Sequence, residues 1–146
     1  MAFRFTLAAV LKYRQALEQR ELTALEKVQQ EIAILETQIS NAEQDLCLLE
    51  RRRNEDLKSG MRARHLQDAI EQEQAIERLR NDLTKKREEL RVKRQEILKA
   101  YEEAHQKREL LERLRDRGFD RYTREQARAE QSAIADLFLA RWKRSQ

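Results

Sequence analysis

The stretch that decides the fold is VQQEIAILETQISNAEQDLCLL, residues 28–49. Seven of its apolar positions are spaced alternately by four and three residues, which places them along one stripe of an α-helix. They are Val28, Ile32, Leu35, Ile39, Ala42, Leu46 and Leu49. Because this spacing is the seam of a coiled coil, the stretch predicts a long helix that packs against a second helix.

A second apolar series follows further along the chain and recurs every seven residues. Its members are Ala69, Ile76, Leu83, Leu90, Ile97, Ala104 and Leu111. The strongest break between the two series is NEDLKSGMR, residues 54–62, where Ser59 and Gly60 favour a turn. With no proline in 146 residues, the sequence predicts an all-α fold, a single antiparallel two-helix coiled-coil hairpin over residues 1–146. We expect a first helix over about 3–56, a turn over about 57–62 and a second helix over about 63–143, which extends past the N-terminus.

The charges indicate how the two helices meet. Residues 18–50 carry eight acidic and two basic side chains, whereas residues 78–94 carry eight basic and three acidic ones. Opposite charges beside a seam favour pairing of these two segments. We therefore interpret the basic run as a pairing face and expect no nucleic-acid binding, because the run also lacks aromatic side chains for base stacking.

A turn centred near Ser59 sets Phe3 opposite about Leu114, so that residues beyond about 117 have no partner in the first helix. This unpaired tail contains AEQSAIADLFLARW, residues 129–142, with nine apolar residues in fourteen. Ile134, Leu137, Phe138 and Trp142 fall on one helical face, and an exposed apolar face marks an interaction site.

Two alternatives remain for this tail. It folds back at RDRGFD, around Gly118, and covers itself against Phe3, Phe5 and Leu7, or it associates with a second copy of the chain. If a partner covers it instead, the N-terminal residues Phe3, Phe5, Leu7 and Leu11 beside the root of the tail belong to the same apolar tip.

The residues offer little for catalysis or metal binding. There is no glycine-rich phosphate loop, no Ser/His/Asp arrangement and no cysteine pair. Glu102 and His105 form one E-x-x-H, half of a di-metal set, but the second histidine, His65, is about 60 Å away on the predicted hairpin. We expect no enzyme, no cofactor and no metal site.

Cysteine usage and hydropathy indicate the compartment. The single Cys47 favours a reducing environment. No segment approaches the roughly 18 to 20 apolar residues that span a bilayer, and the N-terminal uncharged run over residues 5–11 is too short for a signal peptide. The sequence predicts a soluble, cytoplasmic protein.

The two ends of the chain resemble the FliJ family of the bacterial flagellar type III export apparatus. The resemblance is carried by FRFTLAAVLKYRQALEQRE at the N-terminus, and by LLERLRDRGFDRYTREQARAEQSAIAD followed by LFLARW at the C-terminus. Its strongest signals are F-R-F-x-L-x-x-V-L and E-Q-x-x-I-x-D, with Glu130 and Asp136 in the positions of the family's acidic pair. Gly118 departs from the family, in which this stretch is rich in helix formers.

The resemblance implies a non-enzymatic protein similar to the central stalk of rotary ATPases, monomeric before assembly. Its implied partners are the hexameric export ATPase, whose ring it helps to assemble, the membrane export gate and export chaperones, at the cytoplasmic side of the inner membrane. The ATPase-binding residues would be Phe3, Phe5, Leu7, Val10, Leu11, Glu130, Ile134, Asp136, Leu137, Phe138 and Trp142. Leu66 and Ile70 near the turn would contact the gate. The alternatives are an adaptor coiled coil without an ATPase, and the equivalent stalk of an injectisome.

Overall fold

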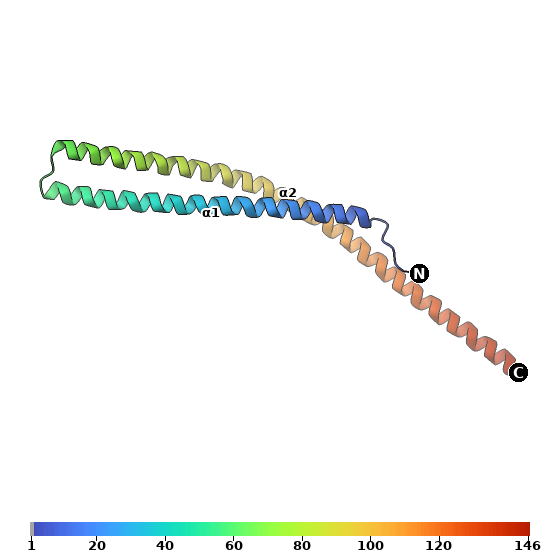
Figure 1. Ribbon diagram of the computed structural model, residues 1–146. Helices are drawn as coiled ribbons and strands as arrows, with labels where there is room; N and C mark the ends of the chain where they lie inside the picture. The colour runs from blue at the N-terminus through green and yellow to red at the C-terminus, as the bar shows by residue number, and fades with distance from the viewer. Residues whose placement is uncertain (1) are drawn as a thin grey trace. The chain divides into compact units, whose positions relative to one another are not determined.

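The protein consists of two α-helices joined by a short turn (Figure 1). The computed structural model describes residues 2–146, in which helix α1 spans Ala8–Lys58 and helix α2 spans Ala63–Ser145. No β-strand occurs among these residues, and the two helices pack against each other. The all-α helical hairpin predicted from the seam spacing is confirmed.

Helix α1 begins at Ala8, later than the predicted start near residue 3. The N–H of Ala8 donates to the carbonyl of Phe5 at 3.2 Å in the turn that precedes the helix. Phe3 and Phe5 therefore lie in a non-helical segment, which fits the modest helix propensity of phenylalanine and threonine. At the other ends, α1 and α2 each run two residues further than predicted, to Lys58 and Ser145.

Contacts along the helices divide the chain into two compact units, which we describe separately. The turn unit comprises Arg20–Tyr101. The terminal unit comprises the residues up to Gln19 together with Glu102–Gln146. Each unit therefore contains part of α1 and part of α2.

The core of the turn unit comes from the apolar seam of α1. Its buried side chains are Leu25, Val28, Ile32, Ile39, Ala42 and Leu46, all of which are 5% to 8% exposed. The remaining predicted seam residues, Leu35 and Leu49, are half-buried. The 3–4 spacing of residues 28–49 thus identified the buried face of α1.

The facing seam of α2 is less apolar, because every second seam position is polar. Ile76, Leu83, Leu90 and Ile97 alternate with Glu73, Arg80, Arg87 and Arg94. The three arginines are half-buried, and Glu73 is the only residue of α2 that is buried in the described part of the chain. Long side chains can cover an apolar surface with their aliphatic stems, and here the Nε atoms of Arg87 and Arg94 are buried as well. This arrangement explains why the buried apolar residues lie on α1 alone.

The turn between the helices depends on Ser59 and Gly60. The N–H and the hydroxyl of Ser59 both donate to the carbonyl of Glu55, at 3.2 and 2.9 Å. They provide hydrogen-bond donors for this carbonyl in the last turn of α1. Gly60 follows with φ of +87°, in the left-handed region that glycine adopts without a steric penalty. The predicted break at Ser59 and Gly60 is therefore the observed one.

Candidate functional site

The root of the C-terminal tail is an aromatic cluster in the terminal unit. The ring of Phe3 lies edge-on to Phe119, with 5.5 Å between centroids, and 5.6 Å from the centroid of Tyr122. The ring also lies over Gly118, where a Cβ would be 3.4 Å from Cζ of Phe3, an ordinary van der Waals distance. The cluster holds the N-terminal segment against α2.

The predicted register placed Phe3 opposite about Leu114, and the structure corrects this by one to two helical turns. Phe3 contacts Gly118, Phe119 and Tyr122 instead. One reason is that the turn begins after Lys58, later than expected. The other is that Phe3 lies before the first turn of α1, where non-helical chain can advance up to about 3.3 Å per residue instead of 1.5 Å.

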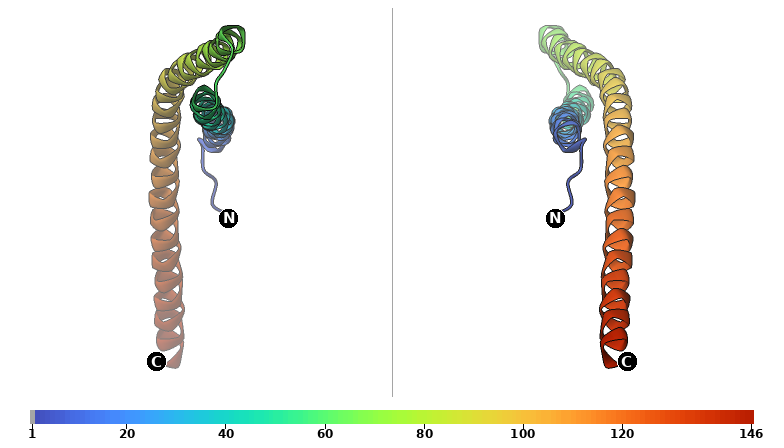
Figure 2. Two further views of the ribbon diagram at one scale, coloured as in Figure 1. Left: turned by 90° about the vertical axis from the view of Figure 1, so that its left-hand side faces the viewer. Right: turned by 90° about the vertical axis from the view of Figure 1, so that its right-hand side faces the viewer.

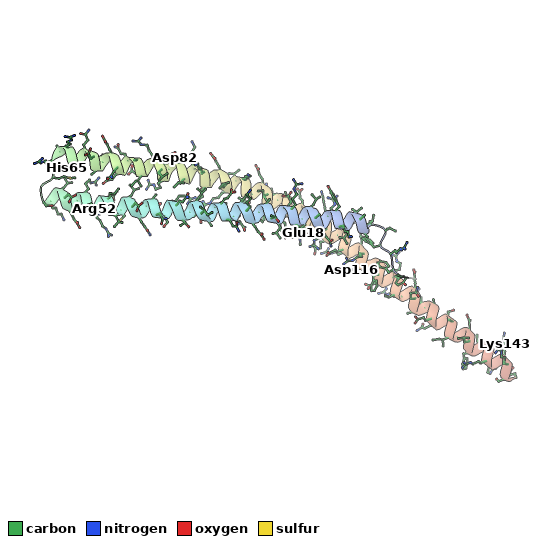
Figure 3. The ribbon with its side chains drawn as sticks, viewed as in Figure 1. Glu18, Arg52, His65, Asp82, Asp116 and Lys143 are labelled. Carbon is green, nitrogen blue, oxygen red and sulfur yellow. The ribbon has the colours of Figure 1, made fainter. Side chains whose placement is uncertain are left out.

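A charged network lies in the same unit, where α1 meets α2 at Glu18 (Figure 3). Glu18 Oε1 is 3.1 Å from Nδ1 of His105, and the second carboxylate oxygen of Glu18 accepts a hydrogen bond from Nε of Arg108. Arg108 Nη1 also lies 2.6 Å from Glu112 Oε2, and His105 Nε2 lies 3.8 Å from Glu109 Oε2. The side chains of Glu18 and Arg108 are 16% and 19% exposed, so the pair lies largely inside the interface.

Burial and charge act in opposite directions on Glu18. Removal from water raises its pKa, but hydrogen bonds from His105 and Arg108 and the positive charge of Arg108 outweigh this, so that the pKa of Glu18 lies below its ordinary value. The hydrogen bonds to Glu18 and Glu112 raise the pKa of Arg108. Both groups are therefore held in their charged forms.

Beyond the network, α2 continues as a single helix, orange to red in both views of Figure 2. All residues from 123 to the end are exposed. Ile134, Leu137, Phe138 and Trp142 are 53% to 68% exposed, although they are large and apolar. Because the helix passes through Gly118 without interruption, the alternative in which the tail folds back at this glycine is wrong.

One comparison with known proteins gives a match over nearly the whole length. The sequence pattern of the family described as "Flagellar FliJ protein" matches residues 3–146. The chain belongs to the FliJ family. Family membership implies a component of the flagellar export apparatus, and the match to a flagellar family favours this machine over the injectisome. No curated protein and no solved structure matches the chain.

The other residues predicted from the FliJ resemblance differ in exposure. Leu11 is only 5% exposed and belongs to the core of the terminal unit, so its side chain is not available to a partner. Leu7 and Val10 are 40% and 41% exposed, and Phe5 is half-buried. Glu130 and Asp136, the acidic pair of the FliJ signature, are both exposed on the tail.

The two residues predicted to contact the export gate lie in the first turns of α2, in the turn unit. Leu66 is half-buried and Ile70 is 38% exposed. The N–H of Leu66 donates to the carbonyl of Arg62 at 3.1 Å as the helix begins. These two residues therefore present a small apolar surface of moderate exposure.

Two arrangements in this FliJ-family chain were not predicted from the sequence. The first is the ion pair between Glu18 and Arg108. The seam spacing was a signal for it, because Glu18 lies seven residues after the seam residue Leu11 and Arg108 lies four after Ala104. The second is a row of exposed arginines on the tail, whose spacing of four, three and four residues could have revealed it. They are Arg117, Arg121, Arg124 and Arg128.

Neither a metal-binding group nor a membrane-spanning helix occurs among the described residues. Within residues 2–146, no set of three or more His, Cys, Asp or Glu side chains is placed to hold a metal ion. No helix in this part of the chain is long and apolar enough to cross a membrane. His105 of the E-x-x-H contacts Glu18 and Arg108.

Proposed function

We propose that the terminal unit is the tip of a central stalk that binds the hexameric flagellar export ATPase. The observation that carries the proposal is the uncovered face of Ile134, Leu137, Phe138 and Trp142. Large apolar side chains gathered on one exposed face indicate a surface that a partner covers. In this role the protein does no chemistry itself and binds no cofactor.

The shape and chemistry of the terminal unit support this proposal. A single helix is about 10 to 12 Å wide with its side chains, which suits entry into the central opening of a ring. The aromatic cluster of Phe3, Phe119 and Tyr122 braces the root of that helix. Phenylalanine and tryptophan, represented here by Phe138 and Trp142, are large anchors of the kind that dominate binding energy at interfaces. Binding of one stalk by several ATPase subunits would promote ring assembly.

The apolar tip also has polar neighbours that would orient it. Glu130 and Asp136 are exposed on the same helix, where they would meet arginines of the ring. Leu7 and Val10 add exposed apolar surface from the N-terminal part of the same unit, and Phe5 adds a half-buried ring. The ATPase-binding surface thus comprises both ends of the chain, without Leu11.

The experiment is a binding measurement between the full chain and the export ATPase. The double variant Leu137→Ala with Phe138→Ala removes two exposed anchors, and it should lose at least tenfold in affinity and no longer promote ring assembly. The matched control is Leu48→Ala with Val92→Ala, two residues of the turn unit that are each 62% exposed. Helix content should be unchanged in both variants, because all four side chains are exposed.

Equal binding by the two double variants would place the ATPase contact elsewhere. Absence of binding by the unchanged protein would favour an adaptor coiled coil that has no ATPase partner. A loss of helix content on changing Leu137 and Phe138 would mean that these residues stabilise the protein itself.

The same proposal assigns the turn unit to the membrane export gate, and places the protein in the cytoplasm at the inner membrane. Leu66 and Ile70 would form this contact, and export chaperones would be escorted to the same apparatus. A photocrosslinker at Ile70, which is 38% exposed, should capture the gate protein and not the ATPase. Capture of the ATPase from this position would reverse the assignment of the two units.

A further inference from the structure

Four arginines form a straight row on the part of α2 between the aromatic cluster and the apolar face. They are Arg117, Arg121, Arg124 and Arg128, and all four are exposed. Together with Asp120 and Glu125 they line one shallow groove on the helix surface. The spacing of four, three and four residues keeps the row on one face over about 17 Å.

No member of this arginine row forms an ion pair with any residue from 2 to 146. This distinguishes the row from other arginines of α2, such as Arg108, Arg113 and Arg91, which pair with glutamates. Exposed like charges three and four residues apart on a helix repel one another weakly. Asp120 and Glu125, which lie three or four residues from these arginines, offset part of this repulsion, so what the row offers an acidic partner is four exposed guanidinium groups without an ion pair in the described part of the chain.

The row continues in phase with the apolar face of the tail. Extending its alternation of threes and fours from Arg128 leads to Gln131, Ala135, Phe138 and Trp142. A partner that follows this face meets guanidinium groups first and aromatic rings afterwards. The row is thus continuous with the part of the apolar face that contains Phe138 and Trp142.

We infer that the arginine row binds an acidic strip of the export ATPase ring, next to the apolar surface of the ring that covers Phe138 and Trp142. This inference rests on the proposed function and deepens it by naming the chemistry of the partner surface. All four basic residues are arginine, whose planar fork can bind a carboxylate through two parallel hydrogen bonds, which lysine cannot do.

Two carboxylates beside the row favour a protein over a phosphate polymer or an anionic membrane. Asp120 and Glu125 flank the arginines in the same groove. A phosphate backbone or a lipid surface would bring its own negative charges against both of them, whereas a protein can place a neutral or basic side chain opposite each. The surrounding surface also has no aromatic ladder for bases, because the aromatic residues of this region, Phe119 and Tyr122, pack against Phe3.

The test replaces all four arginines by glutamine, a comparably good helix former, and measures binding to the ATPase ring across a salt series. The matched control replaces four exposed lysines of the turn unit by glutamine, namely Lys85, Lys86, Lys93 and Lys99. Both variants lose four positive charges. The arginine variant should bind at least tenfold more weakly at about 150 mM salt and show a shallower salt dependence, while the lysine variant should stay within about twofold of the unchanged protein.

A third variant replaces the four arginines by lysine, which keeps the positive charge but loses the planar guanidinium group that can bind a carboxylate through two hydrogen bonds. It should recover part of the affinity, and it provides a second measurement if the glutamine variant loses helix content. Equal binding by the arginine-to-glutamine and lysine-to-glutamine variants overturns the inference.

The outcomes also separate this inference from the proposed function. If the Leu137→Ala, Phe138→Ala variant loses binding while the arginine variant does not, only the inference fails. If the unchanged protein does not bind the ring, both fail. Tighter binding of the unchanged protein to a duplex of about 30 base pairs or to phosphatidylglycerol vesicles than to the ring would assign the row to phosphates and overturn the inference.

Discussion

Gly118 lies inside α2 and under the ring of Phe3, so replacing it by alanine tests both the helix and the aromatic cluster. Alanine is about 1 kcal/mol more favourable than glycine in a helix interior. The new methyl group would lie 3.4 Å from Cζ and 3.6 Å from Cε2 of Phe3, which is ordinary van der Waals contact. The variant Gly118→Ala should therefore be more stable than the unchanged protein by about 0.5 to 1 kcal/mol.

The same change at the turn should have the opposite sign. Gly60 has open space around it, since no atom lies within 4 Å of the point that a Cβ would occupy, but its φ is +87°. An alanine held in this left-handed conformation costs about 1 to 2 kcal/mol. Gly60→Ala is thus a chemically matched control whose effect comes from the backbone alone. Urea unfolding followed by circular dichroism gives both free energies.

Two further variants separate packing from helix propensity at Gly118. Gly118→Leu should be destabilising, because its longer side chain has to displace the Phe3 ring. In a Phe3→Ala background that cost should disappear, whereas the gain from Gly118→Ala should remain. A loss of more than about 0.5 kcal/mol on Gly118→Ala would refute this reasoning, since the ring would then have to lie closer to the helix than 3.4 Å.

Two more predictions concern the two units. Ile39→Ala, at a buried seam position, should lower the free energy of unfolding by about 2 to 4 kcal/mol. Its control Ile34→Ala, at a residue that is 59% exposed, should change the free energy of unfolding by less than about 0.5 kcal/mol. Similar values for the two variants in urea unfolding would contradict the assignment of the seam. Glu18→Gln should cost about 1 to 3 kcal/mol at about pH 7, and the exposed Glu26→Gln little. Because the pKa of Glu18 is lowered in the folded protein, the stabilisation is present above the ordinary value of 4.5 and is lost as the pH falls from there through the lowered pKa. The cost of Glu18→Gln should therefore shrink on acidification below this ordinary value, and a cost that does not depend on pH would argue against the charged pair.

The sequence predicted the helices and the buried face of α1, because the periodic spacing of apolar residues reports directly on which side of a helix is covered. The sequence did not predict that α1 begins only after Phe3 and Phe5. The packing of Phe3 on α2 was not predicted either, because it depends on residues more than a hundred positions away. The apolar face at Leu137 and Phe138 was predicted correctly as exposed, because the first helix is too short to reach it.

The register of the helices was missed for a different reason: apolar seams repeat every seven residues and tolerate a slip by one repeat. Charged residues at seam positions break this symmetry. Glu18 pairs with Arg108 in the terminal unit, and Arg53 pairs with Glu73 in the turn unit. Each pair joins a charged position of α1 to one of α2, and in both helices the two charged positions are 35 residues apart. One register therefore satisfies both pairs at once.

A slip of one repeat in either direction would break this agreement. In one direction Arg53 would face Arg80, and two like charges would meet inside the interface. In the other direction Glu18 would face Tyr101 and Arg53 would face Leu66, so that neither half-buried charge would face an opposite charge. An uncompensated charge in such a place costs more than an ion pair there contributes, so these residues act mainly by destabilising the wrong registers. The polar residues in the seam of α2 lower the stability that an all-apolar seam would give, and in return they select a single alignment of the two helices.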